Sequence, residues 1–367
     1  MITTKIRLTL LALVGALALS GASSAFAAYT TPRLLVTDDR TGPTTIGFTQ
    51  SASDDPSAKL TFYVPAGTTA TLTQAAGTTI GTVTAAGTAG DLGGALLPLT
   101  GTVQVRAASG TYLSGTTQVP IAAAATACTG TVTHTAFWVL ILQAAGQTLE
   151  LPVFVDQVTA PPASAFATAS IQACLPPPDV PVGTPGRATF GFKLTSTVFT
   201  VRDVFASTGS GESRWRLLAT PYTPNTGRAN AAGSVESQSL VSFPRTIALR
   251  KPVRLNARRG TAAYRVSGTL ALPAGGTPTV RLFRGRTASA LGSSSALRVS
   301  GTTFTGSLAV KQTARAQVWF LQARASVPTA DLGATACQST FGVTCLGVTR
   351  AGFTARSATV RLVVPKR

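Results

Sequence analysis

The sequence predicts an all-β protein built from antiparallel β-sandwich domains. Short runs alternate apolar and polar residues, as in "TVQVRA" at 102–107 and "TVRLVV" at 359–364, which is the period of a half-buried strand. The runs are rich in Val, Thr and Phe and are separated by Gly, Pro, Ser and Asn, residues that form tight turns between strands. After the first 28 residues we find no window with the period of an amphipathic helix.

The first 27 residues are expected to be a secretory signal peptide. Two basic residues precede an apolar core at 8–19, and the small residues "AFA" at 25–27 form an A-x-A cleavage pattern. The apolar core is shorter than the roughly 20 residues that a membrane-spanning helix needs. We therefore expect an exported, soluble mature chain that begins at Ala28 and is secreted or held at the cell surface.

Four cysteines suit an oxidising compartment outside the cell. They allow three pairings, and sequence order favours Cys128 with Cys174 and Cys337 with Cys345, because each pair then lies within one predicted domain. No CxxC spacing is present, which argues against a zinc site. We expect two disulfides and no metal or cofactor.

The stretch "TACTGTVTHTAFWVLILQ" at 126–143 raises the question of an active site, because it holds the only histidine, His134. The residues alternate along a strand, and the chain returns at 149–155, so the pattern predicts a hairpin at the core of a sandwich. We expect Trp138 to pack against the disulfide of Cys128. A cysteine followed ten residues later by a tryptophan resembles the immunoglobulin framework, which implies the same architecture.

Charged residues are distributed unevenly between the two parts of the chain. Residues 28–240 hold ten Lys and Arg against eleven Asp and Glu, a net charge of −1, whereas residues 241–367 hold nineteen against one, a net charge of +18. Such a break predicts a near-neutral sandwich region at 28–240 and a strongly basic domain at 241–367. The first region is long enough for two lobes, with a joint near 120–127.

The basic domain resembles the Ig-like sandwich modules of secreted and wall-associated bacterial proteins. The resemblance covers about 120 residues and rests on "RVSGTLAL", "TVRLFRG" and "SGTTFTGSLAV", which are strand-like runs with turn glycines between them. It implies a sandwich fold and a role in adhesion or spacing.

Arginines in the strands of this domain should project outward and attract polyanions. Outside a cell these would be envelope polymers or acidic polysaccharide, and export argues against nucleic acid. The candidates are Arg254, Arg265, Arg281, Arg284, Arg298 and Arg361.

A second candidate surface is the segment "ESRWRLLATPYTPNTGRAN" at 212–230. Trp215 and Tyr222 in this segment could form an exposed platform for sugar rings or a partner. The alternative is that both rings pack in the core or at a corner of the sandwich.

Acidic residues are few, and this limits the chemistry. The pairs Asp38–Asp39 and Asp54–Asp55 are weak calcium candidates, because clustered oxygens in loops suit calcium but neither pair matches a known loop motif. Asp203 and Glu212 could serve a glycoside hydrolase if they face each other.

The sequence therefore favours an exported, non-catalytic binding or structural protein whose basic domain contacts envelope polyanions. Two alternatives stay open. One is a secreted, glycan-active hydrolase that uses the basic domain as an anchor, and the other is an Ig-like spacer without a ligand.

Overall fold

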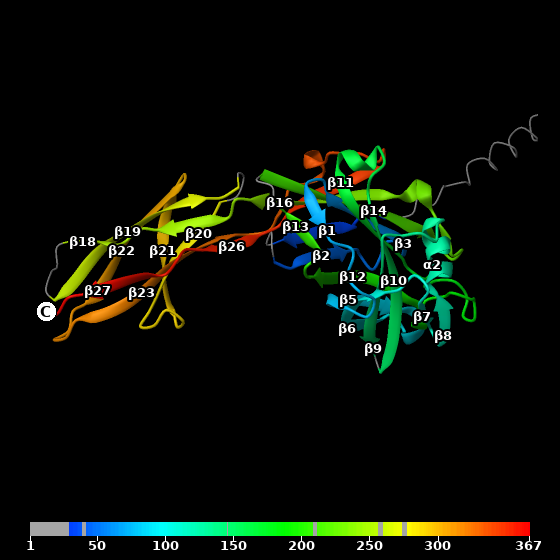
Figure 1. Cartoon of the computed structure of the whole chain (residues 1–367), viewed down its shortest axis with the longest axis horizontal. Helices are drawn as coiled ribbons and strands as arrows, with labels where there is room; N and C mark the ends of the chain where they lie inside the picture. The colour runs from blue at the N-terminus through cyan, green and yellow to red at the C-terminus, as the bar shows by residue number, and fades with distance from the viewer. Residues whose placement is uncertain (1–28, 39–41, 145, 208–210, 256–259, 274–276) are drawn as a thin grey trace, which may run out of the picture.

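The computed structural model describes residues 29–38, 42–144, 146–207, 211–255, 260–273 and 277–367. The expected signal peptide lies outside these residues. Strands dominate the described chain, so the predicted all-β class is confirmed. Figure 1 shows two bodies, which we call the barrel and the sandwich. None of the helices in the described part of the chain is long and apolar enough to cross a membrane.

The barrel is one sheet of 14 strands. All its pairings are antiparallel except that of β16 with β25, and the short β15 pairs with β14 beside the main order. Its order is β1 (Arg33–Asp38), β2 (Thr44–Thr49), β12 (Phe192–Val201), β5 (Thr79–Ala89), β6 (Ala95–Arg106), β9 (Ala136–Ala144), β10 (Gln147–Gln157), β11 (Ala167–Cys174), β3 (Ser57–Pro65), β14 (Gly211–Thr223), β16 (Val235–Phe243), β25 (Thr344–Arg350) and β24 (Ala330–Asp331), with β15 (Arg228–Ala229). Two small ribbons lie beside it, β4 (Thr68–Ala70) with β13 (Phe205–Ser207) and β7 (Thr111–Ser114) with β8 (Thr117–Pro120).

The sheet is nearly closed because its first strand lies beside β16. Ser237 and Ser239 of β16 accept hydrogen bonds from the backbone N–H groups of Leu34 and Val36 in β1, at 3.1 and 2.9 Å. Serine hydroxyls thus satisfy donors that would otherwise remain open at a strand edge. Where alternation predicts a sandwich, the N-terminal strands form one sheet rolled around one core.

Helix α2 (Ile121–Thr129) is an element that the sequence pattern did not reveal. Its side chains Ile121 and Ala125 pack with Phe137 and Phe154 on the outer face of β9 and β10. The predicted joint near 120–127 is therefore this helix, and the strands before and after it belong to one sheet. Short 3-10 turns complete the chain: η1 (Gly90–Leu92), η2 (Ala163–Ala165), η3 (Thr189–Gly191), η4 (Ala231–Gly233) and η5 (Ala334–Ala336).

The hairpin predicted around Trp138 is present as β9 and β10. The position of the indole differs from the prediction: Trp138 lies inside the barrel with its ring centroid 6.4 Å from that of Phe205, whereas Cys128 packs with Phe137 on the outer face. Successive residues of a strand point to opposite sides, so the two clusters share one strand. Both predicted disulfides, Cys128–Cys174 and Cys337–Cys345, are confirmed.

The sandwich is a nine-stranded sheet around a second core. It folds over at β21, whose first half pairs with β20 and whose last three residues pair with β22. A strand that changes partners in this way turns a sheet back on itself. The strands are β17 (Thr246–Leu249), β18 (Val253–Arg254), β19 (Thr261–Ala271), β20 (Thr279–Gly285), β21 (Ser293–Ser300), β22 (Thr303–Lys311), β23 (Gln317–Val327), β26 (Phe353–Arg356) and β27 (Val360–Val364).

Residues 328–352 leave the sandwich after β23 and return to the barrel, and we call them the excursion. Its strand β25 pairs in parallel with β16, so this segment lies in the barrel sheet although the charge break places it in the basic domain. The excursion holds one acid, Asp331, and one base, Arg350. The sandwich without it carries 18 Lys and Arg and no Asp or Glu.

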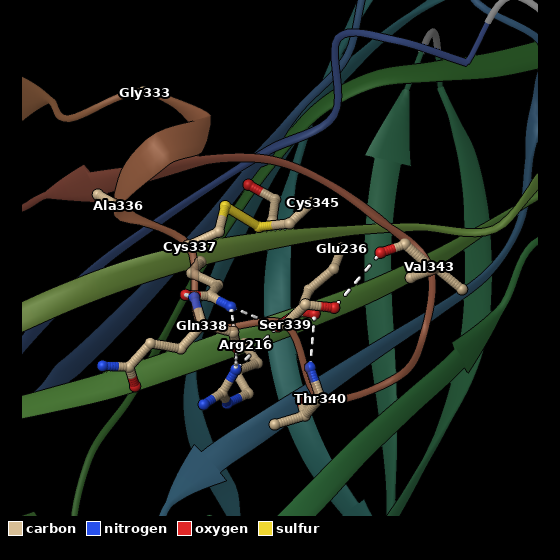
Figure 2. Close-up of a disulfide and its surroundings, with 12 residues drawn as sticks. Arg216, Glu236, Gly333, Ala336, Cys337, Gln338, Ser339, Thr340, Val343 and Cys345 are labelled. Carbon is tan, nitrogen blue, oxygen red and sulfur yellow. Dashed lines mark hydrogen bonds and ion pairs between the residues drawn. A yellow bond between two sulfur atoms is a disulfide. The ribbon is translucent and has the colours of Figure 1, made fainter.

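A buried ion pair fastens the excursion next to the disulfide of Cys337 (Figure 2). Nη1 of Arg216 lies 3.0 Å from Oε1 of Glu236, and the two side chains are 6% and 0% exposed. Nη1 of Arg216 also donates to the carbonyl of Gln338, and the backbone N–H of Thr340 lies 3.4 Å from Oε2 of Glu236. The loop thus supplies polar partners that two buried charges require.

Arg245 lies where the chain first passes from the barrel to the sandwich. Its guanidinium carbon is 4.6 Å from the ring centroid of Phe243 and 4.8 Å from that of Phe353. Its Nη1 donates to the carbonyl of Asp38 in β1 at 3.0 Å. One cation therefore contacts barrel strands β16 and β1 and sandwich strand β26.

Candidate functional site

A row of three arginines crosses the outer face of the sandwich. Arg281 in β20 is the Cα partner of Arg324 in β23, and Arg324 is the Cα partner of Arg356 in β26. Arg281 and Arg356 are exposed and Arg324 is half-buried. Neighbouring strands are about 4.8 Å apart, so three positive charges stand side by side across the sheet.

Neutral groups support this row. The guanidinium carbon of Arg324 lies 4.1 Å from the ring centroid of Phe283, and its Nε donates to Oε1 of Gln322 at 2.8 Å. Nε of Arg281 donates to the hydroxyl of Ser294 at 3.1 Å. These contacts orient the side chains, but they do not neutralise charge. Like charges on directly opposed strand residues destabilise a sheet, and the sandwich has no carboxylate of its own to offset them.

The predicted arginines mostly lie where alternation places them. Five of the six are exposed: Arg254, Arg265, Arg281, Arg298 and Arg361. The prediction is wrong for Arg284, which shares the inward phase of β20 with Leu282 and is half-buried. Its guanidinium carbon lies 5.6 Å from the ring centroid of Trp319, and Arg286 stacks on the same ring at 3.9 Å. The indole offers an attractive face to both cations at this position.

Sequence reasoning missed two of the three row residues, Arg324 and Arg356. Alternation within "QVWFLQARASV" and "FTAR" could have marked both as outward-facing. It could not have shown that β20, β23 and β26 are neighbours, since residues 281 and 356 are 75 positions apart in the sequence.

The structure confirms the alternative for Trp215 and Tyr222, in which both rings are buried and form no exposed platform. Trp215 is 1% exposed and Tyr222 is 8% exposed. The Trp215 ring packs inside the barrel, 5.8 Å from that of Phe205, and the hydroxyl of Tyr222 donates to the carbonyl of Leu175 at 2.5 Å. Trp215 shares the inward phase of β14 with Leu217 and Ala219, whereas Tyr222 is seven positions further on and is buried near the end of the strand.

The calcium candidates are occupied by other partners. Asp54 is buried, and its carboxylate accepts from the backbone N–H groups of Thr30 and Thr31. The ammonium of Lys193 donates to the carbonyls of Ala52 and Asp54. A lysine side chain therefore already occupies oxygen atoms that calcium would need. Burial raises the pKa of the Asp55 carboxyl, and Lys193 opposes that shift.

The other aspartate pair offers no better site. Asp38 is buried and Asp39 lies outside the described residues. Within the ranges that the structure covers, no group of three or more His, Cys, Asp or Glu side chains could hold a metal ion.

The proposed hydrolase carboxylates occupy different surroundings. Asp203 lies in a turn with a positive φ of 57°. Glu212 is at the start of β14 with its side chain 48% exposed, and its Oε1 is 3.9 Å from Nη2 of Arg350. Glu212 is therefore exposed to solvent and does not lie in the apolar pocket that holds an acid catalyst of a glycoside hydrolase.

His134 takes part in an arrangement that the sequence did not predict. Its Nδ1 lies 2.8 Å from Oδ2 of Asp156 and its Nε2 lies 3.0 Å from Oγ1 of Thr129, an order similar to that of a nucleophile, base and acid. The hairpin register could have suggested Asp156, because Val155 is opposite Ala136.

The surroundings of Thr129 oppose nucleophilic chemistry. Its hydroxyl is also 2.9 Å from the carbonyl of Ala125, in the last turn of α2. A helix C-terminus carries partial negative charge, which would destabilise an oxyanion formed there. The His134 side chain is 1% exposed, so this network ties the end of α2 to β10.

No protein-family model matches the chain, and no curated protein matches it. The function must therefore be inferred from the residues themselves. In the arginine row, three arginines that have no carboxylate partner among the residues that the structure describes lie directly opposite one another on neighbouring strands.

Proposed function

We propose that the protein is exported and binds an anionic envelope polymer through the outer face of its sandwich. The observation that carries the proposal is the row Arg281–Arg324–Arg356 in a body without Asp or Glu side chains. A polymer with a phosphate or carboxylate on each repeat unit can meet several guanidinium groups at once. A small anion can bridge neighbouring guanidinium groups but brings only one charged centre, so a row that spans three strands favours a polymer over free phosphate or acetate.

Arginine suits this role because its planar guanidinium forms paired hydrogen bonds with phosphate and carboxylate oxygens. The exposed Arg298 and Arg361 lie on strands β21 and β27, which adjoin β20 and β23. They extend the positive field beyond the row. Binding through several exposed charges weakens steeply as salt rises, because each contact releases counterions.

The two disulfides and the predicted signal peptide support a location outside the cytoplasm. The barrel would then be held at the envelope by the sandwich. The excursion connects the two bodies, so a test needs the whole mature chain: cutting at residue 240 would separate β25 from β16.

The test compares two triple variants of the mature chain on columns of immobilised poly(glycerol phosphate) and polygalacturonate. The first, R281Q/R324Q/R356Q, removes the row. The second, R254Q/R265Q/K311Q, removes the same charge from β18, β19 and β22. We expect wild type to stay bound at 0.15 M salt and the row variant to elute at no more than half the salt concentration that elutes the control.

Equal elution of the two triple variants would show that only net charge matters, and the row would then have no special role. Failure of the wild type to bind either polymer, or isolated envelopes, at 0.15 M salt would favour a spacer without a ligand. Tighter retention on single-stranded DNA than on either glycopolymer would contradict the proposed class of partner.

A further inference from the structure

The barrel contains a partly open cavity of about 410 Å³ that the proposed surface does not use. Its lining comes from strands β3, β5, β6, β9, β10, β11 and β12, from the proline-rich segment that follows β11 and, outside the sheet, from α2 and β7. Protein interiors contain few voids larger than one water molecule. A space of this size falls instead within the range of small-molecule sites, roughly 300–1,000 Å³.

Small residues among large ones leave this space. Leu140, Leu142 and Leu151 line one side, and Ala85 and Ala173 line others where longer side chains would reach inward. Both alanines are buried in the barrel core. The lining is therefore mainly apolar, and such cavities stay dry and accept apolar molecules.

One polar atom of the lining lacks a partner. Trp138 is 1% exposed, and its indole Nε1 has no hydrogen-bond acceptor among the described residues. A buried indole N–H normally finds an acceptor. Two other polar lining groups are already satisfied, because Tyr222 donates to the carbonyl of Leu175 and Thr197 donates to that of Thr84. A ligand with one acceptor would fill this gap.

Phe192, Leu194 and Leu149 of the lining are only partly buried although they pack on the core. We therefore place the entrance of the cavity at this end. The two cations in the lining are engaged elsewhere: Arg187 is 2.7 Å from the carboxylate of Asp91, and Lys193 donates to backbone carbonyls. The entrance thus offers no uncommitted charge to a ligand headgroup.

We infer that the barrel binds a neutral, single-chain lipid with one carbonyl group, whose oxygen accepts a hydrogen bond from Trp138. The hydrocarbon chain lies against the leucines of the lining. This inference is independent of the arginine row, because it concerns the other body of the protein.

The first experiment measures displacement of the neutral fluorophore N-phenyl-1-naphthylamine from the whole mature chain by 2-alkanones of increasing length. Affinity should rise about fourfold per methylene until the cavity is full and then stop rising. Alkanoates of equal length should bind at least tenfold more weakly at pH 8. The inference would be overturned if the fluorophore did not bind. It would also be overturned if affinity kept rising with chain length, as it does for non-specific binding to an exposed apolar surface.

Variants locate the site. Ala173→Leu and Ala85→Leu fill the cavity, so each should weaken 2-alkanone binding at least tenfold while the melting temperature holds or rises. Thr84→Leu adds apolar volume on the exposed face of β5 and should leave binding unchanged. Equal binding by the filled variants and the control would exclude the cavity.

Trp138→Phe tests the hydrogen bond. The ratio of 2-alkanone affinity to that of the n-alkane of equal length should fall about three- to tenfold in this variant. Comparing the two ligands within each protein cancels the change in cavity volume. An unchanged ratio would show that Trp138 does not donate to the ligand. If Trp138→Phe does not fold, indole fluorescence tests the same contact. 2-Alkanone binding should lower the indole emission of wild type but not that of Ala173→Leu. Unchanged emission in wild type would contradict the hydrogen bond.

Discussion

The barrel and the sandwich treat charge in opposite ways. In the barrel, Arg216 pairs with Glu236 and Arg187 pairs with Asp91. In the sandwich, Arg324 and Arg286 lie on aromatic rings and donate to amide side chains. Charges paired internally contribute to structure, whereas charges without a carboxylate can attract an external anion. The charges of the barrel therefore stabilise its fold, whereas those of the sandwich are available to an external anion.

The largest effect is expected from Glu236→Ala, which leaves Arg216 buried without its carboxylate. Removing one partner of a buried pair costs about 3–5 kcal/mol. The excursion should detach because Thr340 loses its acceptor, and because Arg216, which donates to the carbonyl of Gln338, loses the carboxylate that holds it. Urea unfolding gives the free energy, and hydrogen exchange at 344–350 reports detachment. Asp91→Ala, in a pair exposed to solvent, is the control. If Glu236→Ala lowers the free energy of unfolding no more than Asp91→Ala does, the buried ion pair does not stabilise the barrel.

The two disulfides should differ in the next largest effect. On the loop-closure model, the Cys128–Cys174 bridge contributes about 4 kcal/mol and the Cys337–Cys345 bridge about 2.5 kcal/mol, because the first closes the longer loop. The double variants C128S/C174S and C337S/C345S should therefore lose stability in that order in urea. The reverse order would indicate that the excursion matters more to the fold than the position of α2.

Alkaline pH should weaken the barrel through Tyr222. Burial, and secondarily the Asp179 carboxylate, raise the pKa of its phenol from 10.0 to about 12. The folded state then keeps a proton that the unfolded chain loses, so this stability is fully present below pH 10 and is lost as the pH approaches 12. Partial burial lowers the pKa values of Lys59 and Lys193. These lowered values raise stability as the pH rises, and they do so equally in the two proteins compared below.

The measurement compares wild type with Tyr222→Phe in urea at pH 9 and pH 11.5. Between these values wild type should lose about 1–2 kcal/mol more than the variant, less than the full shift implies because the ring is near the surface. Equal losses would mean that the phenol is not held neutral by its surroundings.

Local patterns predicted much of this structure. Alternation located β9, β10 and the exposed arginines of the sandwich, and sequence order located both disulfides. They could not locate the excursion, because its attachment depends on Glu236 and Gln338, which are 102 positions apart in the sequence. Helix α2 was hidden because "IAAAATACT" has small residues on every face, which gives no apolar stripe.

The candidate site likewise combines a local pattern with contacts between distant segments. Alternation within one strand predicts which side chains point outward, and it identified Arg281. The row requires knowledge of which strands are neighbours, so Arg324 and Arg356 emerged only from the fold. The cavity likewise depends on which alanines and leucines meet across the barrel.

The smallest effect, and the sharpest test of the sandwich, concerns Arg324→Gln. This change relieves two cross-strand repulsions, each worth roughly 0.2–1 kcal/mol, but gives up the contact with Phe283, worth about 0.5–1 kcal/mol. Because repulsion is screened by salt and ring packing is not, the variant should be about 0.5 kcal/mol more stable than wild type at 10 mM salt. At 0.5 M salt it should be equal or slightly less stable. Paired urea titrations at the two salt concentrations measure this change. A loss above about 1 kcal/mol at both would mean that Arg324 stabilises the sheet as Arg216 stabilises the barrel, and the contrast between the two bodies would disappear.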